Sequence, residues 1–449
     1  MFRLTILLAA LVVSLFHPSV VDAREFSAAD AARIKKRLTI FAKAKRAVDI
    51  RGIIEELSLT DNPAAIPLLV KAALIVPSAD NYEFAAQSLG SMLSNDCFKW
   101  ITKTLNPKKK TKGLTTRHKL LLVMSLGYRK DKESLPLLTE QIARNDHRYR
   151  LTAIRAADRR RETPLIQPLI DLLGTLEKKK KKDRVWLETR EVLYQITGQN
   201  FEAHEDWVKY WETAKANFDA RQVGKADSKT LVKLGGVKFF GKTIHSHNLI
   251  FIIDTSFSMV KYDLNDEYKG NKPSLDLRRI RRAQRQLVTA LRSLPTEAYF
   301  NVVGFSNKVI PFKKKMCKAT RSNVENAIRY IKTMKPNGDT HTQEALDRAF
   351  ADPNVDTIVL LSDGIPRRKG QATAIGDTQP IIDHIRNTYA GRQVRIDTFG
   401  FAGAGLWPKL DIFKRKGPPP APDDSQLSLF EDFLKQLSEM SGGFYQTIK

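Results

Sequence analysis

Oxygen-bearing side chains follow two strongly apolar segments in the second half of the chain. One segment reads NLIFIIDTSFSM, so Asp254, Ser256 and Ser258 stand at alternate positions directly after five apolar residues. Asp363 likewise follows the apolar run TIVLL, and Thr340 opens a polar loop between the two runs. Two carboxylates and three hydroxyls, with no His, Cys or Lys among them, suit a hard divalent cation such as Mg²⁺. One coordination position of such a site stays available to a carboxylate from another molecule.

Alternating strands and helices from about residue 235 onward must position these side chains. Apolar strands are predicted at 248–254, 299–306, 356–364, 394–401 and 443–449. Amphipathic helices are predicted between them, the first with Ile280, Ala283, Leu287, Leu291 and Leu294 on one face. This pattern predicts a mostly parallel sheet covered on both faces. Ligands bind beyond the carboxyl ends of the strands in such sheets, where the five oxygen-bearing residues fall.

Residues 245–449 resemble a von Willebrand factor type A domain, and the predicted domain spans 241–449. Three motifs carry the resemblance: Asp-x-Ser-x-Ser at 254–258, the threonine of Gly-Asp-Thr-x-Thr at 338–342, and the aspartate of Ser-Asp-Gly at 362–364. The resemblance implies a doubly wound, Rossmann-like α/β fold with a metal-ion-dependent adhesion site. It implies that Mg²⁺, or Mn²⁺ or Ca²⁺, binds there and that an acidic side chain of a protein partner completes the coordination. The implied activity is adhesion or complex assembly without catalysis.

Two loops near the predicted site depart from the family or add to it. An insertion at 260–276 carries Asp263, Asp266 and Glu267 toward the metal face, where one carboxylate would cover the site in cis. The loop after Asp363 reads GIPRRKGQ and places Arg367, Arg368 and Lys369 at its rim. These three cations are predicted to steer an acidic partner toward the metal. The alternative is a solvated loop without function.

The first half of the chain, residues 24–222, reads as helices. A short pattern recurs as IPLLVKAAL, LPLLTEQIA and QPLIDLLG, with its prolines at Pro67, Pro136 and Pro168. Each proline opens an amphipathic helix, where the first turn tolerates it. Paired helices at this spacing predict an α-solenoid that resembles HEAT-like repeats, with an irregular helical bundle as the alternative. Trp207 and Trp211 share one helix face as a packing cap, and residues 223–240 form the predicted linker.

The first 23 residues predict export. Arg3 precedes the apolar run LTILLAALVVSLF, and small or aliphatic residues precede the predicted cleavage after Ala23. This pattern is typical of a signal peptide. The alternative, an uncleaved anchor, is disfavoured because a span needs about 20 apolar residues. With no other apolar segment of spanning length, the mature protein is predicted to have no transmembrane segment and to be secreted, periplasmic or envelope-bound.

The net charge and the cysteine count limit the classes of partner and of fold that we expect. The net charge of +26 favours a partner with exposed Asp or Glu, or an anionic envelope surface. Predicted export argues against nucleic acid. The chain has only two cysteines, Cys97 and Cys317, which exclude a disulfide framework.

Two other functions compete with metal-dependent protein binding. A haloacid-dehalogenase-type phosphatase would need an acid two residues after Asp254, where the chain has Ser256, which cannot act as the acid-base at neutral pH. A metal-free scaffold would bring five oxygen-bearing side chains together without a cation, which is costly when they are buried. We therefore predict a non-catalytic binding protein, with the helical repeats as a second interaction scaffold.

Overall fold

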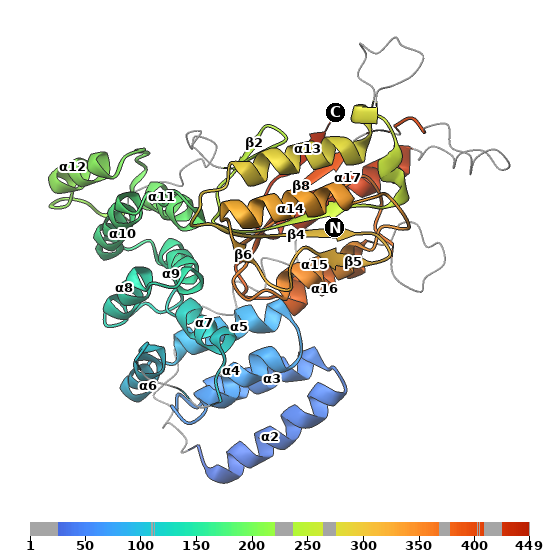
Figure 1. Cartoon of the computed structure of the whole chain (residues 1–449). Coiled ribbons are helices and arrows are strands. Elements are labelled where there is room, and N and C mark those ends of the chain that lie inside the picture. Colours follow the sequence, from blue (N-terminus) through green and yellow to red (C-terminus); the bar gives the residue numbers. More distant parts are fainter. Residues whose placement is uncertain are drawn as a thin grey trace.

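The computed structural model describes residues 26–108, 111, 113–220, 237–263, 275–367, 378–401, 403, 405–407 and 424–448. An arc of helices is followed by a sheet sandwiched between helices (Figure 1). The predicted order, a helical N-terminal region and then an α/β domain, is confirmed. The predicted signal peptide lies outside the described residues.

Helix pairs build the N-terminal half. The helices are α2 (Ala28–Lys43), α3 (Ala47–Ser58), α4 (Ile66–Ile75), α5 (Ala79–Ser91), α6 (Asn95–Leu105), α7 (Thr116–Ser125), α8 (Leu135–Ala143), α9 (His147–Arg160), α10 (Ile166–Lys178), α11 (Arg184–Thr197) and α12 (His204–Ala214). The second helices of successive pairs, α5, α7, α9 and α11, pack on one another in one layer. Gly127 follows α7, and a Cβ added there would lie 2.8 Å from the Cα of Ala156 in α9. The backbone after α7 and the backbone of α9 are therefore nearly in contact.

Local signals in the sequence begin these helices. Pro67 and Pro136 lie in the first turns of α4 and α8, as predicted. Ser94, which precedes α6, accepts a hydrogen bond from the backbone N–H of Cys97 and so caps a helix that has no proline. At the far end Trp207 and Trp211 are buried, in agreement with a packing cap.

A mostly parallel sheet forms the core of the C-terminal half. Its order is β5-β4-β3-β7-β8-β9, and β6 also pairs with β4. The strands are β3 (Asn248–Asp254), β4 (Tyr299–Phe305), β5 (Val309–Pro311), β6 (Cys317–Lys318), β7 (Thr357–Ser362), β8 (Arg395–Phe401) and β9 (Tyr445–Ile448). The five predicted strands are parallel neighbours, whereas the short strands β5 and β6 are antiparallel to β4. Consequently β3 and β7, whose ends carry the predicted ligands, are adjacent at the centre of the sheet.

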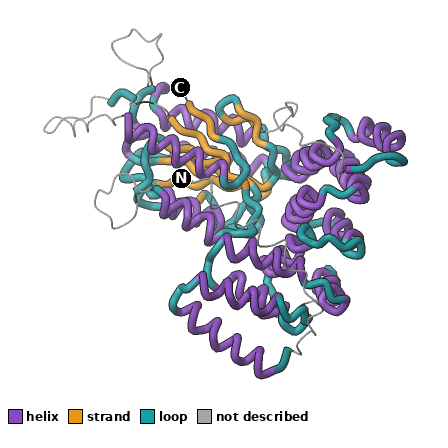
Figure 2. The backbone as a smooth tube through the Cα atoms, turned by 180° about the vertical axis from the view of Figure 1, so that it is seen from behind, coloured by secondary structure: helices purple, strands orange, loops and turns teal. Residues whose placement is uncertain are grey.

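Helices cover both faces of the sheet (Figures 1 and 2). One face packs under α13 (Arg279–Arg292) and α14 (Arg321–Thr333), and the other packs under α15 (Thr342–Phe350), α16 (Gln379–Thr388) and α17 (Asp424–Glu439). The five predicted core positions are all buried, four of them in α13 and Leu294 just after it. Because both faces are covered, the central strands β3 and β7 are buried along nearly their whole length and do not alternate.

A small hairpin precedes the sheet. Strands β1 (Val237–Phe239) and β2 (Lys242–Ile244) pair antiparallel, and β1 packs on α13. The sequence places 237–239 in the linker, but the ring of Phe239 is buried against Phe251 and Phe399 in the core of the α/β half.

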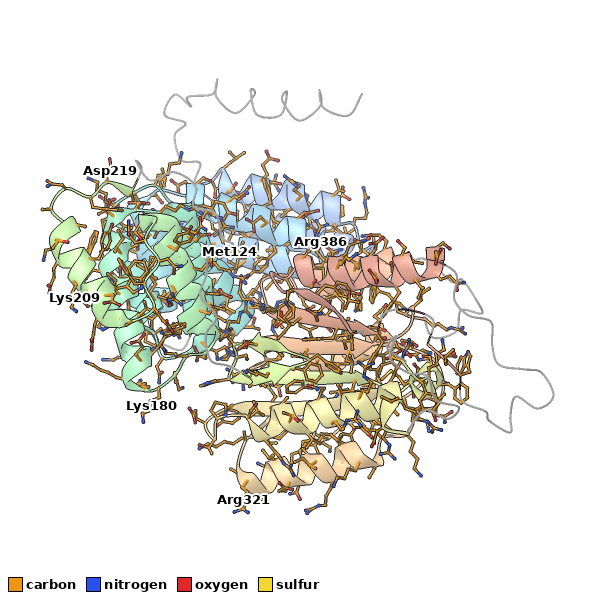
Figure 3. The ribbon with its side chains drawn as sticks, turned by 90° about the horizontal axis from the view of Figure 1, so that it is seen from above. Met124, Lys180, Lys209, Asp219, Arg321 and Arg386 are labelled. Carbon is orange, nitrogen blue, oxygen red and sulfur yellow. The ribbon has the colours of Figure 1, made fainter. Side chains whose placement is uncertain are left out.

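The two halves contact each other at the amino-terminal ends of the strands. Arg184, at the start of α11, is buried and donates to the backbone oxygen of Gln393 at 2.6 Å and to that of Asp356. Arg386 of α16 reaches back to Asp80 of α5 at 2.6 Å (Figure 3). Since ligands bind beyond the carboxyl ends, the helical half leaves that opposite edge of the sheet free.

Candidate metal site

Asp254 ends the central strand β3 and is fully buried. Its Oδ1 accepts the backbone N–H of Ser256 at 2.7 Å, and its Oδ2 accepts the hydroxyl of Ser362 at 2.6 Å. Both bonds fix the carboxylate while leaving each oxygen a second lone pair. The loop after β3 is held from both sides, because Thr255 N–H donates to Phe305 O and Phe257 N–H donates to Gly338 O.

The hydroxyls and the second carboxylate come together on this loop. Ser256 Oγ and Ser258 Oγ are 3.0 Å apart, and Ser258 Oγ donates to Asp363 Oδ1 at 2.5 Å. Asp363 follows β7, the neighbour of β3, and its side chain is fully buried. The structure therefore brings Asp363 to Asp254, Ser256 and Ser258, from which it is more than a hundred residues away in sequence.

Thr340 reaches the same group from the loop before α15. A Cβ added at Gly364 would lie 3.4 Å from Thr340 Oγ1 and 3.8 Å from Ser258 Oγ, so both hydroxyls border the space beside this glycine. The carbonyl of Thr340 accepts the backbone N–H of Arg367 at 2.8 Å, which ties the Thr340 loop to the Asp363 loop. All five predicted ligands thus lie at one edge of the sheet.

The spacing of these oxygens fits a small cation. Neighbouring ligands of an octahedral Mg²⁺ lie about 2.9 Å apart, because each Mg–O bond is about 2.0–2.1 Å. The 3.0 Å between the two serine hydroxyls, which also form a hydrogen bond with each other, is compatible with this edge. Among the described residues no three His, Cys, Asp or Glu side chains form a metal-binding group, so Asp254 and Asp363 are joined there by hydroxyls and not by a third acid, a His or a Cys. This donor set favours Mg²⁺ or Mn²⁺ over zinc, which takes nitrogen and sulfur.

The protonation of Asp254 responds to its surroundings. Burial, and then the neighbouring Asp363 carboxylate, raise the pKa of Asp254 to about 7. Burial and a nearby negative charge both disfavour the ionised form of a carboxyl. A bound divalent ion would offset both effects and favour the ionised form of Asp254.

An arginine that the sequence analysis did not single out pairs with one of the predicted ligands. Arg279, the first residue of α13, has a side chain only 1% exposed, and its Nη1 lies 2.9 Å from Asp363 Oδ2. Its other nitrogens donate to Asp263 Oδ1 at 2.7 Å and to Gly403 O at 2.9 Å. Burial opposes the charge on Arg279, but the two carboxylates outweigh it and raise its pKa. One feature of the sequence could have indicated that Arg279 is buried. It lies four residues before Ala283 and therefore on the apolar face of the helix.

The insertion is held through the same arginine. Asp263 binds Arg279 and, through its other oxygen, Arg282 at 2.7 Å. Tyr262 exchanges backbone hydrogen bonds with Leu406, which follows β8. The carboxylate of Asp263 is therefore engaged by arginines rather than by the hydroxyl ligands. Asp266 and Glu267 lie outside the described residues.

The predicted rim is described only at its first residue. Arg367 is exposed, and its Nη1 lies 3.3 Å from Asp339 Oδ1. Arg368 and Lys369 lie outside the described residues. Part of the positive charge predicted for the rim is thus balanced by an acid on the Thr340 loop.

Two histidines, His245 and His247 in the stretch IHSHN, precede β3 and lie far from the carboxylates of the candidate site. His247 precedes β3, whereas Asp254 ends it, so the seven-residue strand separates them by about 20 Å. A phosphatase mechanism gains no acid-base from them, because a catalytic base must come within hydrogen-bond reach of its proton.

The comparisons with known proteins agree with this fold. A family model described as von Willebrand factor type A domain matches residues 276–405, a stretch that includes Thr340 and Asp363 and begins after Ser258. Human inter-alpha-trypsin inhibitor heavy chain H2 is 30% identical over 131 residues, 26% of this chain and 12% of that protein. Human von Willebrand factor A domain-containing protein 3B is 30% identical over 133 residues, 29% of this chain and 9% of that protein.

The solved structure of a von Willebrand factor type A protein from Catenulispora acidiphila is 18% identical, with a TM-score of 0.31. The match covers 46% of this chain and 39% of that one. The α/β half of this chain is a von Willebrand factor type A domain, and an N-terminal helical region precedes it. The chain spans only about a tenth of the length of the two human relatives. Within the described residues, no helix is both long enough and apolar enough to cross a bilayer.

Proposed function

We propose that this protein binds a protein partner through a divalent cation, most readily Mg²⁺, held by Asp254, Ser256, Ser258, Thr340 and Asp363. The partner supplies an Asp or Glu that occupies the remaining coordination position, and the protein performs no catalysis. The helical repeats serve as a second interaction scaffold. The observation that carries the proposal is the convergence of two carboxylates with buried side chains, Asp254 and Asp363, on the serine hydroxyls of one loop.

The position of the site supports this function. It lies at the carboxyl ends of β3 and β7, whereas the helical half docks at their amino-terminal ends, so an approaching protein meets the site unobstructed by that half. The net charge of +26 favours acidic surfaces as partners. We further propose that the protein works outside the cytoplasm, as its first 23 residues predict.

Metal binding is tested by thermal melts of the whole protein in Mg²⁺, in Mn²⁺ and in chelator. Binding to the folded state alone adds about 2.7 kcal/mol of stability when the free metal is at a hundred times its dissociation constant. Asp254→Asn is the control, because it retains the shape of the side chain and removes one ligand charge. Equal melting temperatures in saturating metal and in chelator would contradict the proposal.

Trp407 offers a second, local readout. Its ring stacks on Phe257, between the two serine ligands, at a centroid distance of 5.7 Å. Titration with Mg²⁺ should therefore change the tryptophan fluorescence of the parent, and the change should disappear in Trp407→Phe. The remaining tryptophans, Trp100, Trp186, Trp207 and Trp211, belong to the helical half and should not respond.

Partner capture requires the metal-bound form. Beads carrying the parent protein should retain proteins from an envelope extract in Mg²⁺ and release them in chelator. Asp254→Ala should capture none of these proteins while keeping its fold, since the residue follows the apolar part of its strand. Equal capture by parent and variant would show that the metal does not bridge the two proteins.

A further inference from the structure

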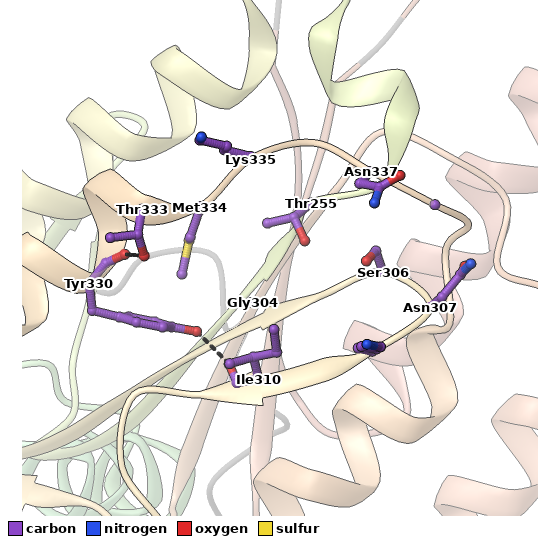
Figure 4. Close-up of a pocket in the computed structure, with 12 residues that line it drawn as sticks. Thr255, Gly304, Ser306, Asn307, Ile310, Tyr330, Thr333, Met334, Lys335 and Asn337 are labelled. Atoms are coloured by element: carbon purple, nitrogen blue, oxygen red, sulfur yellow. Dashed lines mark hydrogen bonds between the residues drawn. The ribbon is translucent and has the colours of Figure 1, made fainter.

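A cavity of about 420 Å³ lies directly beside the metal loop and is not part of the metal site (Figure 4). Thr255, between the ligands Asp254 and Ser256, forms one wall. The loop that carries Thr340 forms another, through Asn337 and Gly338. Asn337 N–H donates to Thr255 O at 2.7 Å, so this wall is bonded to the metal loop. A partner side chain bound to the metal would therefore lie only one or two residues of the metal loop away from this cavity.

The floor of the cavity is apolar. Tyr330, Met334 and Ile310 face one another across it, and the hydroxyl of Tyr330 donates to the carbonyl of Ile310 (Figure 4). Gly304 of β4 keeps the floor open, because a Cβ there would lie 3.3 Å from Met334 Cε and 3.4 Å from Tyr330 Oη. Ile310 is 55% exposed, which leaves a large apolar side chain uncovered at the edge. Methionine adapts to ligands of different shape.

The rim of the cavity is basic. Lys308 and Lys335 are exposed at its edge, and none of the described residues that line the cavity is acidic. The nearby carboxylate of Asp339 is paired with Arg367 at 3.3 Å. An apolar floor within a rim of ammonium groups complements an apolar side chain that is flanked by acids.

We propose that this cavity is a second subsite for the same partner: it takes a bulky apolar side chain located two residues from the metal-bound acid, within an acidic segment of the partner protein. This inference rests on the proposed function. Residues i and i+2 of an extended segment project to one side about 7 Å apart. An i, i+2 pair can therefore place one side chain on the metal and the other in the cavity, since Thr255, which lines the cavity, lies between Asp254 and Ser256. In this arrangement the metal binds the acidic side chain of the partner, and the cavity binds the apolar side chain two residues away.

The experiment is a selection of random twelve-residue peptides displayed on phage, with the immobilised whole protein in Mg²⁺. The parent is expected to enrich peptides with an acid and, two positions away, Leu, Ile, Met or Phe. Filling the cavity by Gly304→Val should abolish the apolar preference and retain the acid. Ile310→Glu, at an exposed position that the fold does not require, should do the same if the first variant is unstable. Leu59→Glu, at a residue 78% exposed in the helical half, is the matched control and should leave the selection unchanged.

Resynthesised peptides should lose about tenfold or more in affinity on Ile310→Glu or when their apolar residue is replaced by Gly, as expected for a buried apolar side chain. An acid enriched without an apolar neighbour overturns the subsite but keeps metal capture. An apolar preference that survives both substitutions also overturns it. A selection unchanged by Asp254→Ala, or no enrichment in Mg²⁺, overturns metal capture and the subsite together.

Discussion

Replacing Arg279 by Met should destabilise the α/β half strongly and make it depend on magnesium. The substitution leaves Asp363 and Asp263 in place without the cation that binds both. The Arg279–Asp363 pair is almost completely buried, with side chains 1% and 0% exposed. Removing one partner of a buried ion pair costs about 3–5 kcal/mol, because the remaining charge is uncompensated. For a domain of roughly 200 residues this corresponds to a decrease in melting temperature of roughly 6–20 °C.

Magnesium should restore part of this loss. A divalent ion on Asp363 replaces the lost positive charge, and the substitution also removes a cation that repels the metal. The increase in melting temperature on adding Mg²⁺ should therefore be larger in Arg279→Met than in the parent. Differential scanning calorimetry of the whole protein, in Mg²⁺ and in chelator, measures both quantities.

Arg282→Met is the matched control for this experiment. Arg282 binds the other oxygen of Asp263 at 2.7 Å and its side chain is 19% exposed. Its loss should cost about 1.5–3 kcal/mol, the range of a hydrogen bond to a charged group, and should leave the magnesium shift as in the parent. The reasoning is refuted if the two variants lose equal stability, or if Arg279→Met gains no more from Mg²⁺ than the parent.

Three further predictions test the site, the domain contact and the rim. Burial and Asp363 raise the pKa of Asp254 to about 7, above the ~3.9 of an unfolded aspartate, so its stabilising contribution is complete below about pH 4 and is lost as the pH rises through 7. The measured quantity is the melting temperature of the parent minus that of Asp254→Asn, both in chelator, and it should be larger at pH 5 than at pH 8. The stabilisation of the parent by Mg²⁺ should in turn be larger at pH 8. A difference in melting temperature that does not change with pH would contradict the raised pKa of Asp254. Gly391→Ala should separate the two halves, because its Cβ would lie 2.2 Å from the ring of Tyr82 at φ +74°, whereas Gly241→Ala, at φ +77° with nothing within 4 Å, should not; equal radii of gyration by small-angle X-ray scattering for the two variants would refute this. Replacing Arg367, Arg368 and Lys369 with Gln should slow association of an acidic peptide from the phage selection and flatten its salt dependence, with little change in dissociation; parallel plots of association rate against ionic strength would show that the rim has no steering role.

Much of the α/β half could be predicted from the sequence because its signals are local. Five apolar segments with amphipathic helices between them indicated the five parallel strands, and the oxygen-bearing residues followed two of these strands. Parallel strands place their carboxyl ends at one edge, so Asp254 and Asp363 had to be neighbours once β3 and β7 paired. The prolines likewise predicted the starts of α4 and α8.

The tertiary structure alone decided which charges meet. Arg279 reads as one of several arginines at the start of a helix, and only the convergence of three loops makes it the buried partner of Asp363. The strands β5 and β6 are too short for a periodic signal and form because β4 offers them an edge. The contact of Arg184 with the carbonyls of Gln393 and Asp356 joins residues about two hundred positions apart, between two halves whose local patterns are independent of each other. Sequence periodicity reports which face of an element is buried, but the partner that buries it is chosen by the packing of the whole chain.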